Sequence, residues 1–113
     1  MKAVCTKFFR FSASFAEGPE IHGHNYVLGV TMPAMDRSAE RRIDEKIDTA
    51  LIRRIDSRDL GIDVDFLKGT PMTDSDLLNA FWQVISREIA PTTLEALSLE
   101  RDRRTVTKLL GES

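Results

Sequence analysis

Residues 11–30, FSASFAEGPEIHGHNYVLGV, contain the pattern that decides the fold. Apolar and polar residues alternate on both sides of the EGPE segment, and such alternation is typical of strands with one buried face. Because Gly18 and Pro19 are turn-forming residues, we predict that the two strands meet there as an antiparallel hairpin. On the second strand His22 and His24 share a face with Tyr26, since residues two apart on a strand point the same way.

The remaining chain predicts two helices and a second hairpin. Residues 38–55 place apolar residues at helical spacing, with Ser38 as the expected N-cap. A second amphipathic helix is expected to begin after its N-cap Thr73 and to end before Pro91. Residues 94–100 and 105–110 are expected to form a closing hairpin. We therefore predict an α+β fold of one domain, residues 1–113, in the order β-β-α-α-β-β, with two helices packed on one face of a four-stranded antiparallel sheet.

Composition argues against several kinds of partner. The 16 Lys and Arg residues and 18 Asp and Glu residues give a net charge of -2 without a basic stripe, so nucleic acid is not an expected partner. No apolar run reaches membrane-spanning length and the first residues do not form a signal peptide, so we expect no membrane partner and a cytoplasmic location. The single cysteine, Cys5, cannot form an internal disulfide, which agrees with a reducing compartment.

The two histidines can offer two imidazoles to one metal ion, because they lie on the same face of a strand. A catalytic zinc normally takes three protein ligands and keeps a fourth position open. His22 and His24 alone are therefore an incomplete zinc site. Two alternatives remain at this point: a metal site that takes a further donor, or paired histidines that are satisfied by hydrogen bonds.

Four segments, in the same order, resemble the 6-pyruvoyl-tetrahydropterin synthase family, which includes 6-carboxy-tetrahydropterin synthase. FSASF with HGHNYVLGV is similar to the family's first two strands, and IDSRDLGIDVDF to its LDHxxLN segment. TPMTDSDLLNAFWQVI is similar to its PTxENLAxxIW helix start, and LSLERD to its VxVxET strand. The resemblance implies the tunnelling fold, a zinc cofactor and a pterin-like small-molecule substrate. It also implies a homo-oligomeric ring, a trimer or hexamer, with sites between subunits.

The chain departs from the family in its metal-binding and acid-base residues. Phe15 stands where the family has its first zinc-binding histidine, and Gly18 stands where it has its catalytic cysteine. Of the family's Asp-His proton relay, Asp56 is retained as a candidate catalytic residue. Ser57 replaces the relay histidine and cannot shuttle protons near neutral pH.

Two glutamates near the turn are candidates to replace what is missing. Glu20 is the first choice, both as third metal ligand and as catalytic base, and Glu17 is the second. Three successive positions on one face of a straight strand span about 13 Å, so Glu20 can reach the ion only if the EGPE turn curls back. A carboxylate is a weaker base than a thiolate unless desolvation raises its pKa, so we do not expect efficient triphosphate elimination.

Substrate binding is expected at Glu100, which the resemblance assigns as the anchor of the ring. A carboxylate can accept two parallel hydrogen bonds from the N–H groups of a 2-amino-4-oxopyrimidine ring, such as that of a pterin or guanine. By the same resemblance, backbone groups around Thr73 and Asp74 complete the ring pocket. Two functions follow: a divergent lyase-type enzyme acting with a metal on the side chain of a dihydroneopterin-like pterin, or an inactive homologue that still binds a pterin or purine.

Overall fold

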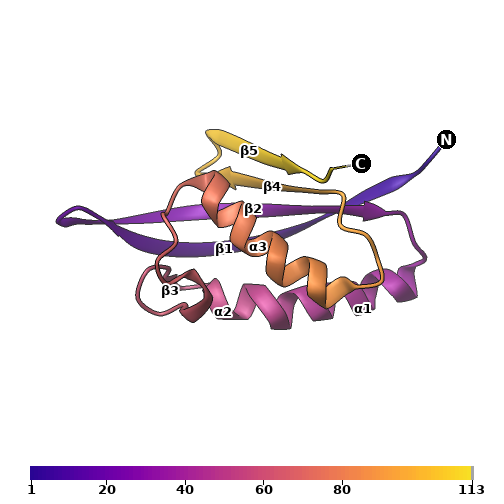
Figure 1. Cartoon of the computed structure of the whole chain (residues 1–113), viewed down its shortest axis with the longest axis horizontal. Coiled ribbons are helices and arrows are strands. Elements are labelled where there is room, and N and C mark those ends of the chain that lie inside the picture. Colours follow the sequence, from indigo (N-terminus) through magenta and orange to yellow (C-terminus); the bar gives the residue numbers. More distant parts are fainter. Residues whose placement is uncertain (113) are drawn as a thin grey trace.

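A long hairpin forms the centre of the sheet in the computed structural model, which describes residues 1–112. Strand β1 (Val4–Glu17) pairs antiparallel with strand β2 (Glu20–Pro33), so that only Gly18 and Pro19 form the turn. Figure 1 shows that the tip of this hairpin extends beyond the other strands. The predicted hairpin is confirmed, and its register places Phe15 opposite His22.

The sheet has five strands, in the order β3-β1-β2-β4-β5. Strands β4 (Ala96–Arg101) and β5 (Thr105–Leu110) form the predicted closing hairpin, and β4 pairs antiparallel with β2. The prediction of four antiparallel strands is corrected by β3 (Arg58–Asp59), which pairs parallel with β1. Two residues are too few to show a periodic pattern, so this strand has no sequence signal.

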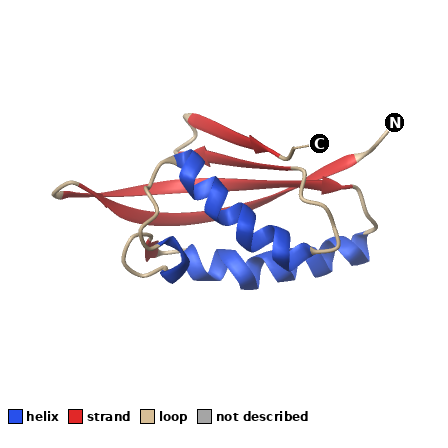
Figure 2. Ribbon diagram, viewed as in Figure 1, coloured by secondary structure: helices blue, strands red, loops and turns tan. Residues whose placement is uncertain are grey.

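The helices lie together on one side of the sheet (Figure 2). Helix α1 (Arg37–Ile47) continues through a π-helical turn, η1 (Asp48–Ile52), into α2 (Arg53–Ile55). A 3-10 turn, η2 (Asp65–Leu67), precedes α3 (Asp74–Ile89). Thr73 caps α3 as predicted, by accepting a hydrogen bond from the amide of Asp76 at 3.2 Å. The predicted Ser38 cap is wrong: Asp36 accepts from the amide of Ala39 at 2.8 Å and so caps α1 two residues earlier.

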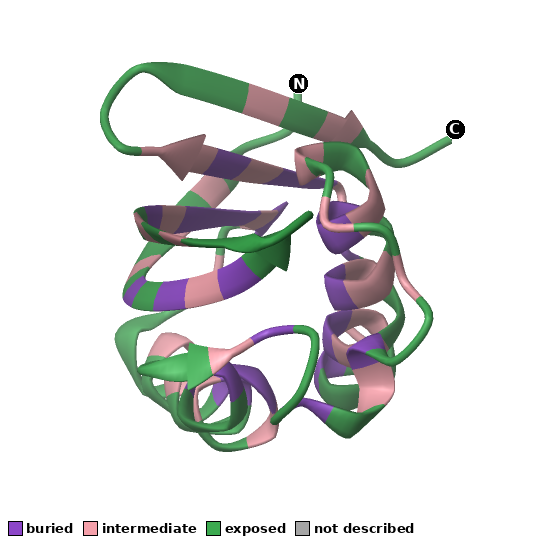
Figure 3. Cartoon of the chain, turned by 90° about the vertical axis from the view of Figure 1, so that its left-hand side faces the viewer, coloured by how far each residue is buried: buried purple, intermediate pink, exposed green. Residues whose placement is uncertain are grey.

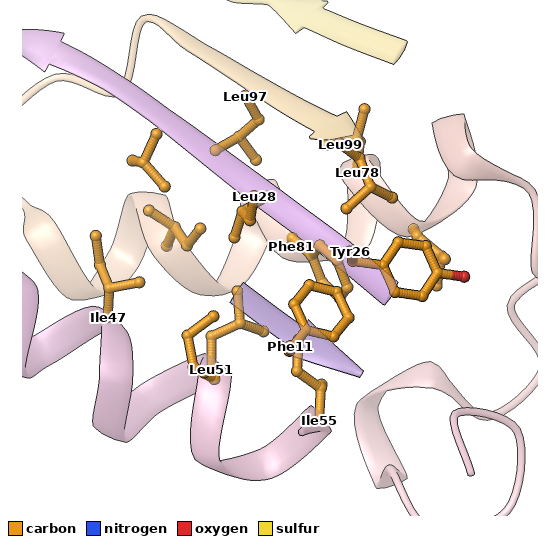
Figure 4. Packing of buried hydrophobic residues seen from close by; sticks show 14 of the residues in the cluster. Phe11, Tyr26, Leu28, Ile47, Leu51, Ile55, Leu78, Phe81, Leu97 and Leu99 are labelled. Carbon is orange, nitrogen blue, oxygen red and sulfur yellow. The ribbon is translucent and has the colours of Figure 1, made fainter. Parts of the chain in front are cut away.

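The core lies between the helices and one face of the sheet (Figure 3). Tyr26 stacks on Phe11, with ring centroids 4.8 Å apart, at one end of this core (Figure 4). The opposite face of the sheet is left open, and Phe8 on it is 67% exposed. No helix within residues 1–112 is both long enough and apolar enough to cross a membrane. The larger fully buried side chains are Tyr26, Phe81, Leu28, Met32, Ile47, Leu51, Ile55, Leu60, Leu67, Leu77, Leu78 and Ile85.

Candidate functional site

The tip of the β1–β2 hairpin holds His22 beside two carboxylates. Gly18 has a φ of 65°, a left-handed conformation that a cysteine would adopt only with strain. Because the turn is tight, Glu17 and Glu20 lie opposite each other across the hairpin. Their Oε2 atoms are 3.6 and 3.3 Å from Nε2 of His22. Both glutamates named from the sequence therefore contact the first histidine of the pair, although both are well exposed.

His24 is held by a residue that the sequence reasoning did not identify. Its Nδ1 is 2.5 Å from Oδ2 of Asp102, and the other oxygen of Asp102 accepts from the amide of Asn25 at 2.8 Å. Asp102 lies in the turn between β4 and β5 with a φ of 53°, and its own amide donates to the carbonyl of Asn25 at 2.8 Å. The hydrogen bond from the Asn25 amide, and after it the one with His24, lowers the pKa of Asp102. An ionised Asp102 thus fixes the ring of His24 and leaves its Nε2 free for another partner.

The face of the sheet that carries the histidines borders a cavity of about 400 Å³, which we call the histidine cavity. Phe15, 8% exposed, closes one side, and its ring centroid is 5.4 Å from that of His24. Thr73 and Asp74 contribute the start of α3, and Arg101 enters from β4. The Nε of Arg101 lies 3.2 Å from both carboxylate oxygens of Asp74. The start of α3 is thereby joined to the end of β4 by an ion pair in the wall of the cavity.

Tyr26 lies on the same face of β2 as His24 and within the core. It is 1% exposed, its ring is 5.9 Å from that of His24, and its hydroxyl has no hydrogen-bond partner among the described residues. In Figure 4 the hydroxyl points away from the apolar cluster. Burial, with a smaller contribution from the charge of Asp74, raises the pKa of Tyr26 to about 12.

A second and larger cavity, of about 560 Å³, holds Glu100, and we call it the Glu100 cavity. Asp56 also lines it, and its Oδ1 accepts from the amide of Ser12 at 3.0 Å, which joins the end of α2 to β1. The hydroxyl of Ser12 donates to the side-chain oxygen of Asn25 at 2.7 Å, in the same wall. Asp56 therefore has a structural partner, whatever further role it plays.

The residues named from the sequence fall into two groups within one chain. His22, His24, Thr73 and Asp74 line the histidine cavity, whereas Glu100 and Asp56 line the Glu100 cavity. The register explains the separation, because Arg101 pairs with Tyr26 and Glu100 pairs with Val27. Neighbouring residues of a strand point to opposite faces, so Glu100 projects away from the face that carries the histidines.

The donors at the hairpin tip do not assemble the zinc site that the resemblance implies. Zinc in a catalytic site takes three protein ligands, and no group of three His, Cys, Asp or Glu side chains among residues 1–112 is arranged to hold an ion. Phe15 occupies the position opposite His22 and supplies no donor atom. The residues present therefore do not fit this cofactor, and we derive no chemical step through it.

Comparison with known proteins agrees with the fold. No protein-family model matches the chain. The chain is 30% identical over 74 residues to 6-pyruvoyl tetrahydrobiopterin synthase of Drosophila melanogaster, a match that covers 60% of this chain and 44% of that protein. The structure of Caenorhabditis elegans 6-pyruvoyl tetrahydropterin synthase superposes with a TM-score of 0.83 and 18% sequence identity, over 97% of this chain and 96% of that one. The chain is thus similar in part of its sequence to one 6-pyruvoyl tetrahydrobiopterin synthase and in its whole fold to another synthase of this kind. It shares the tunnelling fold of the 6-pyruvoyl-tetrahydropterin synthase family, and its matched part spans less than half the length of the curated relative.

Proposed function

We propose that this relative of the 6-pyruvoyl-tetrahydropterin synthases binds a pterin-like compound through Glu100. The observation that carries the proposal is the position of the Glu100 carboxylate, half-buried in the larger cavity. A single carboxylate can accept from the 2-amino group and the adjacent ring N–H of a 2-amino-4-oxopyrimidine at the same time. Asn25 and Ser12 add polar groups to the same wall.

A ligand that reaches both Glu100 and the histidines must lie between two copies of the chain. Within one copy these residues are on opposite faces of the sheet, so a single small molecule cannot contact both. The open face of the sheet and the extended hairpin tip are available for such an arrangement. This geometry supports a homo-oligomer in which one copy holds the ring and the neighbouring copy supplies the histidine cavity.

The chemistry open to this site differs from the elimination implied by the resemblance. Gly18 cannot act as a base, and Ser57 cannot relay protons near neutral pH. Glu20 remains a candidate base near His22, but it is exposed at the hairpin tip. We therefore propose ligand binding as the function that the geometry supports best. Lyase-type chemistry on the pterin side chain, assisted by a metal, needs three donors arranged around one ion, which the described residues do not provide.

Titration with neopterin, followed by the fluorescence of the pterin ring, tests this proposal. Glu100→Gln keeps the size of the side chain but replaces one acceptor by an amide, so we expect affinity to fall more than tenfold. Glu45→Gln, on the exposed surface of α1, makes the same chemical change away from both cavities and should leave affinity unchanged. Equal affinity of the wild type and Glu100→Gln, or no binding by either, would remove the proposal.

A further inference from the structure

Arg101 lines the histidine cavity and has an unused pair of donors. Its Nε is engaged by both oxygens of Asp74 at 3.2 Å, while Nη1 and Nη2 have no hydrogen-bond partner among residues 1–112. A guanidinium offers its donors in a planar fork that matches the two oxygens of a carboxylate. Because one side of the group is held by Asp74, the fork is oriented before any ligand arrives.

Asp74 is suited to this orienting role by its own surroundings. It is the first residue of α3, and only 14% of its side chain is exposed. A partly buried carboxylate on a regular helix has little freedom to move, so the direction of the Arg101 side chain is largely set by the fold. The sequence also marks this position: when Glu100 is aligned with the glutamate of the VxVxET motif, Arg101 stands where that motif has threonine.

The other charges near the cavity offset the attraction of Arg101 for an anion only in part. Glu17 also lines the cavity, but its side chain is 70% exposed, so solvent and salt screen its charge strongly. Asp102 directs its two oxygens to His24 and to the amide of Asn25. Asp74 is already paired with Arg101 itself. A carboxylate bound at the fork would therefore meet Arg101 as its close cation, while Asp74 offsets part of that charge and solvent screens Glu17.

We propose that Arg101, oriented by Asp74, binds a carboxylate group on the side chain of the ligand. This inference rests on the proposed function, and it assigns the ligand class as a pterin whose substituent carries a carboxylate. The ring would be held by Glu100 of one copy, and the substituent would enter the histidine cavity of its neighbour. Arg101 is then the residue that selects among pterins, and Asp74 is its positioning residue.

Two probes, pterin-6-carboxylate and 6-hydroxymethylpterin, share the pterin ring and differ in the charge of the substituent. Binding of either probe tests the proposed function, and the difference between their affinities tests this inference. We expect the wild type to bind the carboxylate about tenfold or more tightly than the alcohol. Arg101→Gln should remove this preference and leave the affinity for the alcohol unchanged. Arg104→Gln removes the same charge from the exposed β4–β5 turn and should keep the preference.

Arg101→Lys keeps the positive charge next to Asp74 and so guards against a loss of folding in Arg101→Gln. It lacks the planar fork, so most of the preference should be lost while circular dichroism and melting remain those of the wild type. If both probes bind the wild type equally, or if Arg101→Gln and Arg101→Lys keep the preference, the role of Arg101 is wrong while binding through Glu100 stands. If neither probe binds, the proposed function fails and this inference fails with it.

Discussion

Replacing Tyr26 by phenylalanine removes one buried oxygen and almost nothing else. The side chain is 1% exposed, and its hydroxyl has no hydrogen-bond partner within residues 1–112. A buried polar group without a partner costs about 1–3 kcal/mol relative to its hydrated state in the unfolded chain. Tyr26→Phe keeps the ring, whose centroid lies 4.8 Å from that of Phe11, so the contribution of ring packing to stability is unchanged.

We therefore expect Tyr26→Phe to increase the free energy of unfolding by about 1–2 kcal/mol, the lower part of that range. For a chain of this length, 1 kcal/mol corresponds to about 4 °C in the melting temperature. Urea unfolding followed by circular dichroism measures the difference directly, provided that the unfolding free energy of both proteins depends on urea concentration with the same slope.

Thr6→Val is a suitable control because it also deletes a hydroxyl, but one that is exposed and paired with Thr31 at 2.7 Å. It should change stability by no more than about 0.5 kcal/mol, and not upward. If Tyr26→Phe lowers stability by 1 kcal/mol or more, the hydroxyl has a partner in solution, and the description of a buried, unpaired hydroxyl on the residue next to His24 on this face is wrong.

Two further predictions concern metal binding and pH. Elemental mass spectrometry of protein purified without chelator should find well under one zinc per chain. Phe15→His restores an imidazole opposite His22 and should gain zinc. One zinc per wild-type chain that is lost in His22→Ala would contradict the incomplete donor set. The hydrogen bond to Asp44, opposed by burial and supported by Glu40, raises the pKa of Lys7 above its ordinary value of 10.5. The ion pair therefore stabilises the fold fully below pH 10.5, and this stabilisation is lost as the pH rises through the folded pKa. Above pH 10.5 the free energy of unfolding from urea titrations should fall more steeply with pH for the wild type than for Lys7→Met. Parallel curves for the two proteins would refute the contribution of this ion pair.

Most of the architecture could be predicted from the sequence, because each element carries a local pattern. Alternation identified β1 and β2, the turn residues Gly18 and Pro19 located the hairpin, and Thr73 marked the start of α3. The two failures have local explanations. Strand β3 is too short for any periodic pattern, and Asp36 and Ser38 are both good capping residues, so only the observed hydrogen bond to the Ala39 amide decides between them.

The candidate site could be predicted only in part. The sequence placed His22 and His24 on one face and named Glu17 and Glu20 as their neighbours, and both glutamates contact His22 at the hairpin tip. Asp102 was not identified, because it lies 78 positions from His24 and meets it only through the pairing of β2 with β4. Asp102 lies in the charged turn RDRR, which was the only sequence feature of this segment that could have drawn attention to it. Charged turns of this kind usually face solvent without binding another residue.

By itself the sequence determined the order of the elements and which residues share a face, since both follow from local periodicity and turn chemistry. The tertiary structure decided how those faces meet. Register between β2 and β4 places Arg101 opposite Tyr26, near Asp74 and the histidines, and Glu100 opposite Val27. A shift of one residue would exchange them, because side chains alternate with a period of two, and no local pattern in LSLERD specifies which partner residue each one faces.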